Sequence, residues 1–329
     1  MTFPPPTAGT GTMRAIVLDA FGGPNRLTVR TLPLPPAPGA HEILVRTVAA
    51  AVNPVDLQTR AGLHASHSSV ELPMILGWDV AGVVEATGSA VTFLRAGDRV
   101  IAMSAQMATG RGTYAERVVL PADLAAPAPR SIPLEEAAAL PLAGLTALQA
   151  LDRLALAPGE RLLVTGALGA VGACATQLAV LHGVHVTAHV RDPRRAHEAK
   201  ALGADHVCTQ RELIPRSCDA MLDTAGLPEL IETVRPGGRA ISIVPTRPLP
   251  HQGDIATATS HVEQSGEQLA RLVRLVDDGQ LRLRPGLRLA FEQARRAHEL
   301  LAGGGLNGKV LLLPALRENG ADSGIGTGG

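Results

Sequence analysis

Two patterns of hydrophobic and polar positions follow each other along the chain. From Met13 to about Ala128, short apolar runs rich in β-branched residues are separated by turns that contain Gly or Pro. The clearest runs cover residues 42–52, 79–88 and 114–120. Runs of this length and spacing predict short strands in a compact, partly closed β-domain.

The pattern changes after the proline-rich stretch 121–133. Residues 134–156 are rich in Ala and Leu with helical spacing, and beyond them apolar runs alternate with helical segments. Such alternation is typical of βαβ units, so we predict a doubly wound parallel sheet with helices on its faces. Residues 266–302 are expected to be largely helical, and residues 309–314 to form a final strand.

The two ends of the chain lack a periodic pattern. Residues 1–12 are rich in Pro, Gly and Thr, without a positive charge or an apolar core. They predict a disordered leader rather than a signal peptide. Residues 316–329 are rich in Gly and predict a disordered tail.

Composition and charge exclude several classes of function. The chain has 329 residues with 30 Lys+Arg against 30 Asp+Glu, a balance that argues against a nucleic-acid-binding surface. No apolar run approaches the roughly 20 residues of a membrane-spanning helix. The three cysteines, Cys174, Cys208 and Cys218, are too few for a disulfide framework or a four-thiolate zinc site. We therefore expect a soluble, cytoplasmic protein with no nucleic-acid or membrane partner.

A Gly-rich turn at residues 165–172 lies between a buried-strand pattern and a helix pattern. Small residues at 167, 169 and 172 suit a tight turn, the approach of a pyrophosphate and close packing of helix on strand. The residues expected to contact the cofactor here are Ala167, Gly169, Ala170, Val171 and Gly172. Alone, the segment could be only a tight turn. Because a second strand–helix unit follows it, we predict a dinucleotide-binding site.

The end of the next strand bears on which nicotinamide cofactor is bound. Folds that bind NAD usually carry an acidic residue there, but residues 188–190 contain none. Arg191, Arg194 and Arg195 follow, and guanidinium groups suit a 2′-phosphate. The segment could instead be a solvated helix start capped by Asp192, and Asp192 could itself bind a ribose. We predict NADPH as the cofactor.

Several short motifs occur in a fixed order around this turn. They are Asn53-Pro54-Val55-Asp56, Gly77-Trp78-Asp79-Val80-Ala81-Gly82, Gly97-Asp98-Arg99-Val100, Gly112-Thr113-Tyr114-Ala115-Glu116, Leu140-Pro141-Leu142-Ala143-Gly144 and Gly308-Lys309-Val310. Together they resemble the zinc-independent, quinone-oxidoreductase branch of the medium-chain dehydrogenase/reductase superfamily. The resemblance implies an α/β protein with a GroES-like, β-rich substrate domain interrupted by a Rossmann nucleotide domain, and an active site between the two.

The resemblance also implies the domain organisation. We expect a GroES-like catalytic domain at 13–128, a Rossmann NADPH-binding domain at 129–250, and a C-terminal segment at 251–315 that returns to the catalytic domain. Relatives are commonly homodimers or homotetramers paired through an edge strand of the nucleotide domain. The run at 239–245 is a candidate for that edge.

Zinc-dependent members of the superfamily hold a catalytic metal with a Cys, a His and a second Cys. This sequence has Asn53, Trp78 and Leu142 at the matching motif positions, and these side chains cannot form the shell that zinc prefers. Hydride delivery to an already electrophilic carbon does not need such a Lewis acid. The resemblance thus implies a metal-free reductase of quinones or of the activated C=C bond of α,β-unsaturated carbonyls.

The resemblance assigns roles to single residues. Asn53 is expected to hold the substrate carbonyl or the nicotinamide end. Tyr114, the only tyrosine, is expected to face the substrate pocket as the candidate proton donor. Their alternatives are a simple Asn-Pro turn and a half-buried strand aromatic. The further residues expected near the cofactor are Thr146, Thr224, Ser242, Ile243 and Asn307.

Aromatic residues are scarce, at 2% of the chain, which argues against a wall of rings for stacking a quinone. An aliphatic pocket would suit linear enones or enoyl thioesters equally well. Two alternatives therefore stay open. One is a trans-acting enoyl-thioester reductase in polyketide or fatty-acyl metabolism, and the other is a catalytically weak NADPH-binding sensor or interaction protein.

Overall fold

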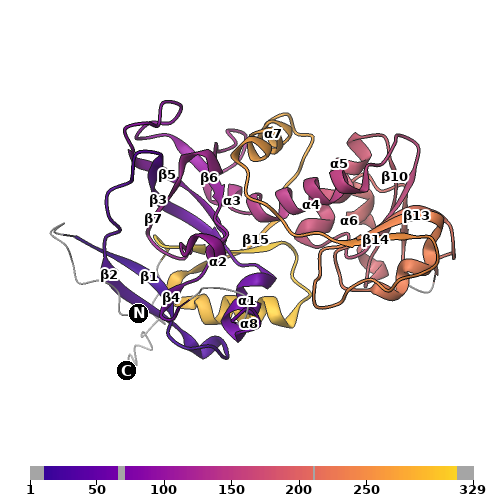
Figure 1. The fold of residues 1–329 in the computed structure, drawn as a ribbon, viewed down its shortest axis with the longest axis horizontal. Helices are drawn as coiled ribbons and strands as arrows, with labels where there is room; N and C mark the ends of the chain where they lie inside the picture. Colours follow the sequence, from indigo (N-terminus) through magenta and orange to yellow (C-terminus); the bar gives the residue numbers. More distant parts are fainter. Residues whose placement is uncertain (1–10, 66–70, 210–211, 317–329) are drawn as a thin grey trace, which may run out of the picture.

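The computed structural model describes residues 11–65, 71–209 and 212–316. Two bodies lie side by side, one rich in strands and one in which helices cover a sheet (Figure 1). The expected disordered leader and tail fall almost wholly outside the described residues, although the first strand already begins at Thr12. Within the described ranges, no helix is long and apolar enough to cross a membrane.

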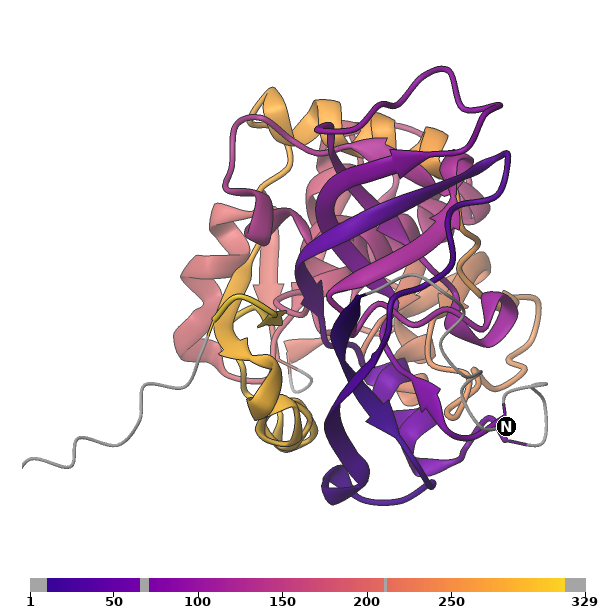
Figure 2. The same ribbon diagram turned by 90° about the vertical axis from the view of Figure 1, so that its left-hand side faces the viewer.

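The first body is built mainly on antiparallel strands (Figure 2). Its seven-stranded sheet has the order β15-β16-β3-β5-β6-β8, with β7 paired to β3, and a three-stranded sheet has the order β2-β1-β4. The backbone amide of Ile16 in β1 donates to the carbonyl of Tyr114, which ties the two sheets together. The strands that precede the nucleotide domain are β1 (Thr12–Leu18), β2 (Leu27–Pro33), β3 (Glu42–Ala51), β4 (Met74–Ile75), β5 (Asp79–Thr87), β6 (Arg99–Met103), β7 (Arg117–Pro121) and β8 (Ala125–Pro127). The short helices of this part are α1 (Pro54–Ala61), α2 (Gln106–Thr109) and α3 (Leu134–Ala137).

The second body contains a six-stranded sheet in which every neighbouring pair is parallel. The order is β11-β10-β9-β12-β13-β14, so the chain reverses its direction of travel across the sheet between β9 and β12. Ligands of doubly wound sheets bind outside the carboxyl ends of the strands at such a point. The elements are β9 (Arg161–Val164), β10 (His185–His189), α6 (Ala196–Ala201), β11 (His206–Cys208), β12 (Cys218–Asp223), β13 (Val234–Ser242) and β14 (Ala256–Thr259). The predicted α/β fold class is confirmed.

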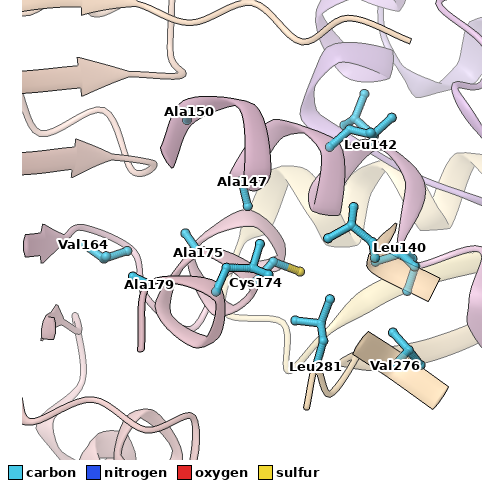
Figure 3. Packing of buried hydrophobic residues seen from close by; sticks show 14 of the residues in the cluster. Leu140, Leu142, Ala147, Ala150, Val164, Cys174, Ala175, Ala179, Val276 and Leu281 are labelled. Atoms are coloured by element: carbon cyan, nitrogen blue, oxygen red, sulfur yellow. The ribbon is translucent and has the colours of Figure 1, made fainter. Parts of the chain in front are cut away.

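Helices α4 (Pro141–Leu154) and α5 (Ala170–Leu181) pack together through small side chains. Figure 3 shows Ala147 of α4 near Cys174 and Ala175 of α5, with Leu140 and Leu281 on one side of the contact. The same buried cluster runs from Trp78 in the first body to Val164 in the parallel sheet. Helix α4 contacts strands β5 and β6 of the first body and β12 and β13 of the second, so it packs against both.

The segment expected to return to the catalytic domain differs from its prediction in two ways. First, β14 is the sixth strand of the parallel sheet, so the nucleotide domain extends past residue 250 and the run at 239–245 is not at its edge. Second, the expected helical stretch contains helices α7 (Gly266–Asp277) and α8 (Ala294–Gly303) but also β15 (Pro285–Ala290) between them. Pro285 and Gly286 interrupt the helical pattern there. Strands β15 and β16 (Lys309–Leu313) then complete the first sheet.

Candidate functional site

The turn between β9 and α5 leaves no room for added side chains. A Cβ atom at Gly172 would lie 2.3 Å from the carbonyl oxygen of Gly166, and Gly166 itself has a φ of +59°. The amide of Gly169 donates to the same oxygen at 2.8 Å, which closes the turn. This close packing brings backbone N–H groups toward the place that a pyrophosphate takes in such folds.

Helix α5 begins directly after the turn. Its N-cap, Gly169, is exposed and extended and makes no side-chain cap. The first amides of a helix have no partner within the helix, so they are available to an anion. Ala167 is buried, whereas Ala170 and Val171 are half-buried at the helix start. The residues predicted to contact the pyrophosphate thus lie together, and their geometry fits a dinucleotide.

A buried carboxylate organises the neighbouring strand ends. Asp223, the last residue of β12, accepts hydrogen bonds from Thr165 Oγ1 at 2.6 Å and from Ser242 Oγ at 3.2 Å. The Thr224 hydroxyl donates to the carbonyl of Thr165 at 2.6 Å, and the Ile243 amide donates to the carbonyl of Asp223 at 3.0 Å. The structure therefore brings Thr224, Ser242 and Ile243 to the carboxyl edge of the sheet, beside the turn.

The three arginines predicted for a 2′-phosphate have different surroundings. Arg194, with 88% of its side chain exposed, pairs with Asp192 at 2.9 Å. Arg195 pairs with Glu198 at 2.5 Å. Arg191 is exposed, and no described residue forms a hydrogen bond or ion pair with its guanidinium. Of the three, Arg191 is therefore the one whose charge the described part of the protein leaves unpaired.

Asn307 joins this group from the segment that follows α8. Its Oδ1 accepts hydrogen bonds from Arg195 at 2.9 Å and from Arg284. Arg284 also pairs with Glu198 at 2.5 Å. Hydrogen bonds from Arg195 and Arg284 lower the pKa of Glu198 to about 2, so the carboxylate stays ionised. The network ties the C-terminal segment to the start of α6.

A buried ion pair lies behind Asn53. Asp79 has no exposed surface and lies 2.5 Å from Nζ of Lys309. The same carboxylate accepts hydrogen bonds from Asn53 Nδ2 at 2.9 Å and from the backbone amide of Leu142 at 2.7 Å. Asn53 Nδ2 also donates to the carbonyl of Ala51 at 3.1 Å. Because both neighbours are acceptors, the nitrogen of the Asn53 amide must face them, and both of its hydrogens are used.

Tyr114 is fully buried in the substrate domain. Its hydroxyl donates to Asp56 Oδ2 at 3.0 Å, and the backbone N–H of Asn53 donates to the same oxygen at 2.8 Å. Burial raises the pKa of Asp56 to about 7, and burial beside Asp56 raises the pKa of Tyr114 well above its ordinary value. The ring meets His298 edge-on at 6.0 Å between centroids. This buried position differs from the expected one, in which Tyr114 faces the substrate pocket. The phenol can lie in the core because Asp56 supplies the hydrogen-bond partner that a buried hydroxyl needs.

The positions that match the metal ligands of zinc-dependent relatives carry Asn53, Trp78 and Leu142. Trp78 and Leu142 are 6% and 9% exposed, and Thr146 Oγ1 donates to the carbonyl of Leu142 at 2.6 Å. Amide, indole and isobutyl groups are not zinc ligands, so these residues do not fit a catalytic zinc. The described ranges also contain no group of three or more His, Cys, Asp or Glu placed to hold a metal.

Comparison with known proteins covers both bodies. Residues 39–130 match the family described as alcohol dehydrogenase GroES-like domain, and residues 202–312 match the one described as zinc-binding dehydrogenase. The chain is 30% identical to the quinone oxidoreductase of Mus musculus, over 93% of this chain and 99% of that protein. The chain belongs to the quinone-oxidoreductase family. The predicted family resemblance is thus confirmed.

Other quinone-oxidoreductase relatives are similar over nearly the whole chain. The chloroplastic NADPH-dependent alkenal/one oxidoreductase of Arabidopsis thaliana is 29% identical, over 92% of this chain and 80% of that protein. The solved quinone oxidoreductase of Coxiella burnetii superposes with a TM-score of 0.83 at 28% identity, over 93% of this chain and 100% of that one. The residues matched to the zinc-binding description, 202–312, include none of the three positions where the metal would be held.

Two important groups escaped the sequence analysis. Asp223 precedes Thr224 in the loop that the family resemblance places under the nicotinamide ribose, but the sequence alone does not show that its carboxylate organises the strand ends. The pair of Asp79 and Lys309 was not foreseen either. Each of the two stands inside a recognised motif, and Lys309 is one of only two lysines among 30 basic residues. The scarcity of lysine is the feature of the sequence that could have drawn attention to Lys309.

Proposed function

We propose that this protein is an NADPH-dependent oxidoreductase that transfers hydride to a quinone or to the activated C=C bond of an α,β-unsaturated carbonyl. One observation carries the proposal: an intact dinucleotide turn stands beside metal-ligand positions occupied by Asn53, Trp78 and Leu142. The names of the relatives from Mus musculus and Arabidopsis thaliana support the same substrate classes.

Different parts of the protein would bind the two halves of the cofactor and orient the substrate. When bound, the dihydronicotinamide supplies the hydride. The amides at the start of α5 would hold the pyrophosphate, and the carboxyl edge shaped by Asp223 would hold the nicotinamide half. Quinones and enones already present an electron-poor carbon, so the protein needs to position that carbon and to stabilise charge on the carbonyl oxygen.

The direct test is turnover. We expect the protein to oxidise NADPH, followed at 340 nm, in the presence of a benzoquinone, a naphthoquinone or a linear enone but not a simple ketone. A ketone lacks the conjugated electrophilic carbon, and Asn53, Trp78 and Leu142 cannot hold a metal that would polarise it. Turnover of crotonyl-CoA alone would favour the enoyl-thioester reductase. Binding of NADPH without turnover of any of these compounds would contradict the proposed function and favour a sensor.

We propose that Arg191 gives the preference for NADPH over NADH. Arg194 and Arg195 are paired with carboxylates, whereas Arg191 is not paired with any described residue. Replacing Arg191 with Ala should raise the KM for NADPH by about tenfold or more, because a charge-assisted hydrogen bond contributes about 1.5–3 kcal/mol. The KM for NADH should stay unchanged.

The matched control for this variant is Arg194→Ala. This variant also removes one positive charge from the same segment. The charge of Arg194, however, is already paired with Asp192. We expect it to change the NADPH constant by less than threefold or so, since a paired, exposed arginine contributes little. Equal effects of the two variants, or an equal effect of Arg191→Ala on both cofactors, would refute the assignment.

A further inference from the structure

The indole N–H of Trp78 is a buried hydrogen-bond donor without an acceptor. The side chain is 6% exposed, and its Nε1 atom is covered and has no partner among the described residues. Leaving a buried donor unpaired costs about 1–3 kcal/mol, so such a group in a native protein calls for an explanation, such as a catalytic role or a bound water or ion. The acceptor could be supplied by a bound molecule.

The hydrogen-bond donors at the other two metal-ligand positions are already used. Both hydrogens of Asn53 Nδ2 go to Ala51 and Asp79, so this amide cannot also donate to a substrate oxygen. At Leu142 the backbone amide donates to Asp79, and the side chain has no polar atom. Of the three side chains at the metal-ligand positions, only Trp78 therefore keeps an unused N–H.

The hydroxyl of Tyr114, expected at the substrate pocket, and the hydroxyl of Thr146, expected near the cofactor, are committed as well. The Tyr114 hydroxyl donates to Asp56, and the Thr146 hydroxyl donates to the carbonyl of Leu142. The proton of each is thus held by the protein.

Trp78 also lies where the two bodies meet. It belongs to a buried cluster that contains Leu142 at the start of α4 and Ala167 in the dinucleotide turn. Ile243, at the carboxyl edge of the parallel sheet, packs against the same cluster. The cluster that contains Trp78 therefore joins side chains of the first body to side chains at the carboxyl edge of the parallel sheet.

We infer that the indole N–H of Trp78 donates to the carbonyl oxygen of the substrate, in the place of a polarising metal. The inference rests on the proposed function. As hydride forms a C–H bond at the electron-poor carbon, the π-electron pair moves to the oxygen, and NADPH leaves as NADP⁺. The indole hydrogen bond stabilises the enolate or hydroquinone anion until the oxygen takes a proton from water. Because Nε1 is covered in the free protein, neighbouring side chains must move aside for the substrate.

Trp78 is the only tryptophan of the chain, so its indole N–H gives a single resonance in a ¹⁵N-labelled sample. The test uses the full chain with NADP⁺, which cannot deliver hydride, and cyclohex-2-enone as the probe. We expect the indole proton to shift downfield when the enone is added. Cyclohexene, which has the same ring without the oxygen, should leave the resonance in place.

The variant that tests the same bond is Trp78→Phe, which keeps an aromatic ring and removes the N–H. We expect kcat with the enone to fall by about 100-fold, with the KM for NADPH unchanged. The melting temperature should fall only by the effect of the smaller buried ring, because the lost donor was unpaired.

The results of these experiments distinguish a failure of the proposed function from a failure of the inference about Trp78. If the wild-type protein reduces no quinone or enone, the proposed function fails. If it reduces the enone while the indole resonance stays in place, or if Trp78→Phe keeps full kcat, only the inference about Trp78 is overturned.

Discussion

Asp56 shows how a single buried group can make stability depend on pH. Its carboxyl has no exposed surface, and burial raises its pKa from 3.8 to about 7. Between these two pH values the folded protein binds the proton more tightly than the unfolded chain does. The stability that this group contributes is therefore complete below about pH 4 and is lost as the pH rises through 7.

Asp56→Asn resembles the protonated acid at every pH. We expect the variant to gain about 2–3 kcal/mol relative to the wild type between pH 5 and pH 8, because the wild-type carboxyl ionises more readily in the unfolded chain than in the core and the amide does not ionise in either. Denaturant unfolding at the two pH values measures this difference.

The control is Asp192→Asn. Hydrogen bonds from Arg194 hold the pKa of Asp192 below its ordinary value, so this carboxyl stays ionised throughout that interval. Its effect on stability should be the same at both pH values. A constant effect of Asp56→Asn would contradict the argument.

At the scale of single residues, the sequence identified candidate site residues but not their hydrogen-bond partners. Asn53 and Tyr114 were found through short motifs that can be recognised locally. The groups that occupy their polar atoms, Asp79 and Asp56, stand 26 and 58 positions away in the chain. Hydrogen-bond partners of this kind follow from the tertiary fold, so their identity could not be derived from the motifs alone.

At the scale of elements, the best predictions were those with a local cause. The unit from β9 through the turn to α5 combines a buried strand, a required glycine and an apolar helix, and each of these leaves a pattern in the sequence. Strands β14 and β15 were missed because their burial is weak. β14 lies at a sheet edge with half of its residues exposed, and β15 is buried only at its last two residues. Sheet pairing alone defines them.

At the scale of the whole molecule, the carboxylate of Asp79 connects segments that are distant in sequence. It binds the loop before α1, the N-terminus of α4 and the first residue of β16. The last contact closes a separation of 230 positions, across the entire inserted nucleotide domain. The ion pair with Lys309 therefore fixes the returning strand to the centre of the first body.

Lys309→Met should lower the free energy of unfolding by about 3–5 kcal/mol, because it leaves the Asp79 carboxylate in the core without its cation. Denaturant unfolding measures the loss. Adding Asp79→Asn to the same chain should recover part of it, since the uncompensated charge is then gone. A double variant no more stable than Lys309→Met would show that the charge is not the cause.

Lys200→Met is the matched control, because Lys200 is the only other lysine and lies exposed on α6. We expect this variant to change stability by less than about 0.5 kcal/mol. A similar loss in both lysine variants would contradict a special role for the buried pair.

The burial of Lys309 also has a chemical consequence. An acylating reagent reacts with free, solvated amines, and Lys309 is 6% exposed and held by a carboxylate. Among the lysines, such a reagent should therefore modify Lys200 alone, on a helix beside the parallel sheet. Once the N-terminal amine is blocked, coupling to an activated ester would attach a dye or a solid support at Lys200, with every molecule presented in the same orientation.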